Sequence, residues 1–162
     1  MQKSLSNAAL KKILDTANER DLFIVGHMYI ENTIDRILEK KFSIPSKSID
    51  STLFTLNLKM DILIESGLIK GNVKKNVELL ARIRNRYAHK LEPNEQRITN
   101  YIRELQYIGP APKAVGKYAK YRVCVIRTFS VLVKMLRKYG TINIEYSYSY
   151  PWTTQLVECG FT

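Results

Sequence analysis

Apolar residues recur at steps of three and four between residues 72 and 91, and this spacing predicts an amphipathic helix. The apolar positions are Val73, Val77, Leu80, Ala81, Ala88 and Leu91. Arg84 falls within the same stripe. An arginine at such a position is either an ion-paired core residue or a residue turned toward an interface cleft. Because an amphipathic helix must bury its apolar stripe against a neighbour, the pattern favours a packed helical fold.

The same spacing, interrupted at Pro45 and Gly67, predicts five further helices, at about 6–17, 20–42, 51–66, 93–108 and 114–139. Residues 141–150 alternate and are rich in β-forming side chains, which indicates a hairpin or an extended arm. We therefore expect an all-α, up-and-down bundle of five or six helices in residues 1–140. A short β-rich tail is expected in residues 141–162.

The net charge of +11 implies an anionic partner, and nucleic acid is the first candidate. An acidic protein, a membrane surface and plain solubility are the alternatives. The segment from Lys113 to Lys138 holds many basic residues and no acidic one. Five of them share one face of the last predicted helix: Lys117, Lys120, Arg127, Lys134 and Lys138. We interpret this face as a groove that follows the phosphates of RNA, with a solvated outer face as the alternative.

Arg84, Asn85 and His89 bring a cation, an amide and an imidazole together on the helix predicted at 72–91. At about 100° per residue, Asn85 and His89 stand one above the other and Arg84 lies beside them. An imidazole can move the proton of a ribose 2′-hydroxyl, and a guanidinium can stabilise charge on a phosphate. Asn85 can orient the ring of His89 or bind phosphate. The sequence therefore predicts a catalytic site for RNA cleavage formed by Arg84, Asn85 and His89.

Each of these residues also has a structural interpretation. A lone histidine on a helix is usually structural, and the alternative role for Arg84 is an ion pair with Glu31 or Asp35 on an early helix. Arg86 faces away from Arg84 by about 200°, toward solvent or the path of the RNA. His27 lies in an apolar stretch, where we expect a hydrogen-bonded core histidine.

The string Arg84-Asn85-Arg86-Tyr87-Ala88-His89 resembles the R-x4-6-H signature of the HEPN superfamily, including the Asn that many members carry after the Arg. Residues 56–69, which end in Gly-Leu-Ile, are similar to the mannitol-repressor-like branch, in which such a helix end precedes the motif helix. The resemblance covers roughly residues 20–92. It also implies that an acidic residue on an early helix, Glu31 or Asp35, faces the motif helix.

The resemblance implies a homodimer in which the two motif helices meet across a cleft. It implies metal-independent endoribonuclease activity that leaves a 2′,3′-cyclic phosphate, used by a toxin or a phage-defence effector. An antitoxin or regulatory protein would then be a further partner. The alternatives are a non-catalytic, mannitol-repressor-like regulator and a protein- or RNA-binding dimerisation module with a degenerate site.

Several classes of site are not expected from the sequence. The two cysteines, Cys124 and Cys159, form no C-x-x-C pair, and with only two histidines a zinc site is not expected. The sequence contains no P-loop for nucleotide phosphates, no G-x-S-x-G motif of serine hydrolases and no H-E-x-x-H motif of zinc peptidases. The start of the chain lacks the apolar core of a signal peptide, and no apolar run reaches the length of a membrane span. We therefore expect a cytoplasmic protein without metal or cofactor.

Overall fold

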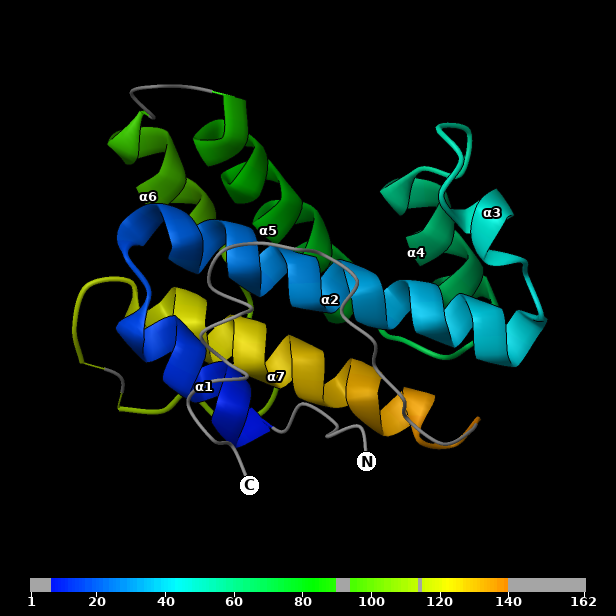
Figure 1. Cartoon of the computed structure of the whole chain (residues 1–162). Coiled ribbons are helices and arrows are strands. Elements are labelled where there is room, and N and C mark those ends of the chain that lie inside the picture. Colours follow the sequence, from blue (N-terminus) through cyan, green and yellow to red (C-terminus); the bar gives the residue numbers. More distant parts are fainter. Residues whose placement is uncertain (1–6, 90–93, 114, 140–162) are drawn as a thin grey trace.

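The computed structural model describes residues 7–89, 94–113 and 115–139, and it contains seven helices and no strand in these residues (Figure 1). The helices are α1 (Asn7–Thr16), α2 (Glu19–Phe42), α3 (Ser46–Ile49), α4 (Leu56–Glu65), α5 (Gly71–His89), α6 (Glu95–Glu104) and α7 (Ala119–Leu136). The predicted all-α class is confirmed. The count exceeds the expected five or six because the short α3 precedes α4. The predicted β-rich tail lies outside the described residues.

Helix α2 is the centre of the fold and packs against both α5 and α7 (Figure 1). Helix α1 rests on α7, α6 rests on α5, and α3 and α4 pack against α2 near its C-terminal end. The side chains of Phe23, Ile30 and Ile34 on α2 are fully buried in the shared core. Tyr29 and Phe129 join α2 to α7 by an edge-to-face ring contact with centroids 6.3 Å apart. No helix of the described residues is both long and apolar enough to cross a membrane.

Helices α4 and α6 are both shorter than the sequence pattern predicts, and in each case a hydrogen bond explains the difference. Helix α4 begins at Leu56 and not near residue 51, because the Thr55 hydroxyl accepts the Leu58 N–H and caps the helix there. Helix α6 ends at Glu104 and not near residue 108. The buried Asn76 amide of α5 binds the backbone N–H and carbonyl of Gln106, each at 2.8 Å, and holds that residue outside the helix.

The last helix begins five residues later than expected. Gly116 and Tyr118 both have left-handed backbone angles, with φ of 108° and 61°. The chain therefore turns sharply just before Ala119, where α7 begins. Consequently Lys117 precedes α7 and Lys138 follows its end, so the predicted basic stripe extends beyond the helix on both sides. By contrast, Gly67 has the left-handed conformation expected after the end of α4, with φ of 70°.

Candidate functional site

The motif residues on the C-terminal half of α5 differ in their exposure to solvent. Asn85 and His89 lie one turn apart on an exposed face of α5, which we call the outer strip. Arg84 is half-buried because it lies on the side of α5 that faces the core. Its Nη1 donates a hydrogen bond of 2.9 Å to Asn85 Oδ1. This bond brings a cation to the edge of the strip that carries His89.

Arg82 belongs to the same outer strip and was not singled out from the sequence. It precedes Asn85 by three residues and His89 by seven, and all three side chains are exposed. The spacing of three and seven was a signal that could have found it, because residues so separated share a helix face. Arg86, assigned to RNA binding from the sequence, is half-buried. Arg82 is therefore an exposed cation on the strip, two turns before His89.

The acidic residues expected to pair with Arg84 have other partners in the structure. Asp35 Oδ1 accepts a hydrogen bond of 2.7 Å from the buried Lys59 of α4. Glu31 Oε2 lies 3.5 Å from Nδ1 of His27, one turn earlier on α2. No ion pair links Arg84 to either carboxylate within the described residues. The predicted pairing is therefore replaced by the hydrogen bond from Arg84 to Asn85.

His27 is buried, as the sequence indicated, but it is not the hydrogen-bonded core histidine that we expected. The residue is 3% exposed, and neither ring nitrogen has a hydrogen-bond partner among the described residues. Burial lowers the pKa of His27, the neighbouring Glu31 carboxylate raises it, and the Arg84 guanidinium lowers it further. The net effect is a lowered pKa, which favours a neutral ring beside Arg84.

A carboxylate at the start of α2 ties the motif helix to the beginning of α7. Glu19 accepts hydrogen bonds from the hydroxyls of Tyr87 on α5 and of Tyr118, and from Lys117 Nζ at 3.3 Å. Burial raises the pKa of Glu19, but the bonds from Tyr118, Tyr87 and Lys117 outweigh this effect and lower it. Phe23 packs beneath the rings of Tyr87 and Tyr118, with centroids 4.6 and 5.0 Å away. This Glu19 cluster fixes Tyr87, two residues before His89.

The five residues of the predicted basic stripe do not form one continuous solvated face. Lys117 binds Glu19, and Lys120 Nζ donates to the carbonyl of Arg103 at 2.5 Å. Arg127 Nη1 donates to the carbonyls of Ile108 and Pro110, at 3.1 and 2.6 Å. Lys134 and Lys138 are exposed. Sequence spacing placed the cations on one side of the last helix, but it could not reveal the Glu19 carboxylate that binds Lys117 or the backbone carbonyls that bind Lys120 and Arg127.

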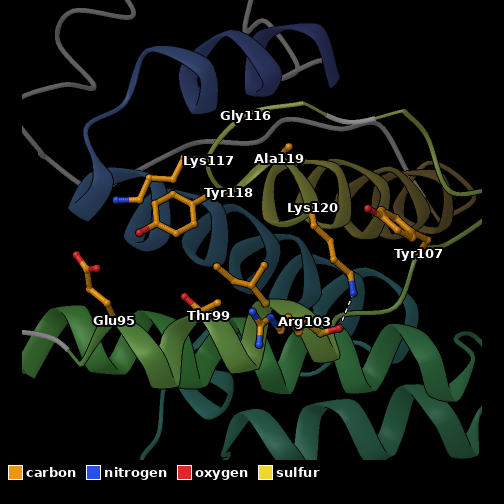
Figure 2. A pocket seen from close by; sticks show the side chains of 10 residues that line it. Glu95, Thr99, Arg103, Tyr107, Gly116, Lys117, Tyr118, Ala119 and Lys120 are labelled. Atoms are coloured by element: carbon orange, nitrogen blue, oxygen red, sulfur yellow. Dashed lines mark hydrogen bonds between the residues drawn. The ribbon is translucent and has the colours of Figure 1, made fainter.

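A cleft of about 430 Å³ lies between α6 and the start of α7 (Figure 2). Its lining combines three cations, one carboxylate and two tyrosines with small and apolar side chains. The residues are Glu95, Thr99, Ile102, Arg103, Tyr107, Gly116, Lys117, Tyr118, Ala119 and Lys120. Figure 2 shows Lys120 reaching across from α7 to the last turn of α6, with Tyr107 beside it and Glu95 at the opposite end. The sequence indicated Lys117 and Lys120 but not the contribution of α6.

Within the described part of the chain, no group of three His, Cys, Asp or Glu side chains is placed to hold a metal ion. Cys124 is buried, and burial raises the pKa of its thiol to about 11 although Lys120 and Arg127 lower it. A buried thiol with a raised pKa is a poor nucleophile. The candidate chemistry therefore rests on Arg84, Asn85 and His89.

Comparison with family models, with curated proteins and with solved structures finds no match to this chain. The resemblance to the HEPN superfamily consequently depends on the motif residues themselves.

Proposed function

We propose that this chain is a metal-independent endoribonuclease of the HEPN type, acting as a toxin or phage-defence effector. The observation that carries the proposal is the pairing of Arg84 with Asn85 at the edge of the exposed strip that presents His89. A phosphodiester that reaches this strip would meet an imidazole, an amide and a guanidinium together. The charge of +11 favours a polyanionic substrate.

In the proposed reaction the ribose 2′-oxygen attacks the adjacent phosphorus atom and loses its proton to a base. The bond from phosphorus to the 5′-oxygen then breaks, and that oxygen takes a proton from an acid. The products are a 2′,3′-cyclic phosphate and a free 5′-hydroxyl. His89 moves one of these protons, Arg84 stabilises the charge that builds on the phosphate, and Asn85 orients the ring or the phosphate.

A second proton-transfer group is needed on the opposite side of the phosphate. His27 is poorly suited to this role because it is buried. In a two-fold dimer the partner copy would supply a second His89, and isologous dimers are the commonest form of oligomer. We therefore include a homodimer, with the outer strips of both α5 helices facing each other, in the proposal.

The test is to identify the ends of the products formed from a mixed RNA pool. The proposal expects 2′,3′-cyclic phosphate ends, and no cleavage of a substrate that has deoxyribose or 2′-O-methyl ribose at every position. Products with 3′-hydroxyl ends would contradict the proposed reaction. If no RNA is cut and expression in cells is harmless, the non-catalytic regulator or binding module takes its place.

A further inference from the structure

Two cations lie close to the Tyr107 ring, a third lines the same cleft, and none of them has a carboxylate partner among the described residues. Arg103 comes from the last turn of α6, while Lys120 and Arg127 come from α7. Lys120 Nζ lies 5.5 Å and Arg127 Cζ 5.9 Å from the centre of the Tyr107 ring. Among the described residues none of the three forms an ion pair, in contrast to Lys117, which binds Glu19. We call these three side chains and Tyr107 the Tyr107 cluster.

Neutral acceptors hold two of these cations in place. Lys120 donates to the carbonyl of Arg103, and Arg127 donates through Nη1 alone to two carbonyls of the loop between α6 and α7. A carbonyl fixes a cationic side chain but does not cancel its charge. A lysine ammonium has three donors and a guanidinium has five, so further donors remain on both groups. The cluster is therefore an ordered centre of positive charge, which suits a phosphate group.

We propose that the cleft between α6 and the start of α7 binds a phosphate group of single-stranded RNA at its Arg103–Lys120 end. The volume of about 430 Å³ falls within the range of about 300–1,000 Å³ that is typical of sites for small ligands. Glu95 lies at the other end of the cleft, away from Tyr107 (Figure 2). Repulsion by this carboxylate therefore directs the phosphate toward Arg103 and Lys120.

The lining also offers aromatic surface for the base attached to that phosphate. Tyr107 and Tyr118 both line the cleft. Stacking of a base on an aromatic ring does not depend on the identity of the base, and it contributes about 1–3 kcal/mol per base in single-strand binding proteins. The site should consequently accept single-stranded RNA of any sequence, with the strand fixed mainly through its backbone.

The cleft is connected to the motif helix through the Glu19 cluster. Tyr118, in the lining, and Tyr87, on α5, donate to the same Glu19 carboxylate. The choice of RNA as the polyanion rests on the proposed function, whereas the phosphate site itself rests on the cations. A strand bound here would be held by groups rigidly joined to the helix that carries Arg84, Asn85 and His89.

The test uses Arg103→Ala, because this exposed side chain makes no hydrogen bond or ion pair within the described residues and its backbone carbonyl would still bind Lys120. Arg97→Ala is the matched control: it removes an equal charge from an exposed position of α6 outside the cleft. The probe is a short, fluorescently labelled single-stranded RNA with 2′-O-methyl riboses, which prevents cleavage. Its affinity is measured by fluorescence anisotropy over a series of salt concentrations.

We expect Arg103→Ala to weaken binding about three- to tenfold at low salt and to reduce the slope of log K against log[salt] by about 0.7, the value for one lost phosphate contact on a single strand. Arg97→Ala should change neither quantity measurably. Equal effects of the two substitutions would overturn the assignment. This probe cannot be cut, so binding is measured independently of cleavage. If the wild-type protein cuts no RNA in a separate assay, the proposed function is rejected but the phosphate site is not.

Discussion

His27 is the residue of the α2–α5 interface whose surroundings are least expected from the sequence. It is buried, its two ring nitrogens have no hydrogen-bond partner in the described part of the chain, and it lies near Glu31 of its own helix and Arg84 of α5. Burial and Arg84 lower its pKa, and Glu31 only partly opposes them. An unfolded chain would take up a proton near the ordinary histidine pKa of 6.5, whereas the folded chain resists it. The contribution of His27 to the free energy of unfolding is therefore complete above that pH and declines below it.

We predict that His27→Gln makes the free energy of unfolding less dependent on pH between about 7.5 and 5.5. The measurement is thermal or urea unfolding of the wild type and the variant at both pH values. The control is His89→Ala, which removes the other histidine of the chain from an exposed position. It should retain the wild-type dependence on pH. If His27→Gln loses stability on acidification as steeply as the wild type, the assignment to His27 is wrong.

Asp35 acts in the opposite direction over part of the same range. Burial raises its pKa to about 6, although the hydrogen bond from Lys59 lowers it. The folded state therefore binds a proton at Asp35 before the unfolded state does, and this uptake stabilises the fold as the pH falls through about 6. The two contributions have opposite signs in the wild type. The comparison between variants, and not the wild-type slope alone, is therefore the informative quantity.

At the scale of helices, α2 packs tightly against α7 at Gly26. A Cβ atom at this position would lie 2.8 Å from Tyr121 Oη and 3.2 Å from a methyl group of Val125. Tyr121 is fully buried, and its hydroxyl donates toward the carbonyls of Leu22 and Phe23. Because neither neighbour can turn into solvent, a side chain at Gly26 would force the helices apart.

We predict that Gly26→Ala lowers the stability by about 1–3 kcal/mol, the usual cost of overpacking a core. In a chain of this size each kcal/mol corresponds to about 2–4 °C in Tm. Gly71→Ala is the matched control, because Gly71 begins α5 and no atom of the described residues lies within 4 Å of its Cβ position. Thermal unfolding should show a clear loss for Gly26→Ala and none for Gly71→Ala. Equal Tm values would contradict the packing argument.

The helices themselves could be predicted from the sequence, but several of their ends could not. The spacing of apolar residues located α1, α2 and α5 to within a few residues, because the signal lies inside each element. The end of α6 depends instead on Asn76, which binds Gln106 from 30 positions away in the chain. A pattern of neighbouring residues contains no information about such a bond.

The candidate site, too, could be predicted from the sequence only in part. Helical spacing correctly placed Asn85 and His89 on one strip of α5. It could not place Arg84 beside His27, nor show that Asp35 binds Lys59, because these relations depend on how α2, α4 and α5 pack. The Tyr107 cluster could not be predicted from the sequence for the same reason. Arg103 and Lys120 are far apart in sequence and meet only across the packed helices.

For the whole molecule, we predict a symmetric dimer in solution. The proposed reaction needs two proton-transfer groups, and each chain offers one exposed histidine within its described residues. Sedimentation velocity at micromolar concentration should give the mass of two chains. Arg82→Glu, placed on the exposed strip, should shift the distribution toward single chains, whereas Arg97→Glu on α6 should not. A single-chain mass for the wild type at every concentration would contradict the prediction.

The central claim is that His89 moves a proton during RNA cleavage, and one measurement tests it most directly. Purified wild-type protein and His89→Ala are incubated with the same mixed RNA pool, with and without EDTA. Lys75→Ala, on the same exposed side of α5 but near its other end, is the control.

The account predicts that the wild type and Lys75→Ala cut RNA equally in both conditions. His89→Ala should cut about 10²–10⁴-fold more slowly, as expected when a proton-transfer group is lost. Its stability should change by only about 0.5 kcal/mol because the side chain is exposed. Cleavage at the wild-type rate by His89→Ala, or complete loss of wild-type cleavage in EDTA, would contradict the account.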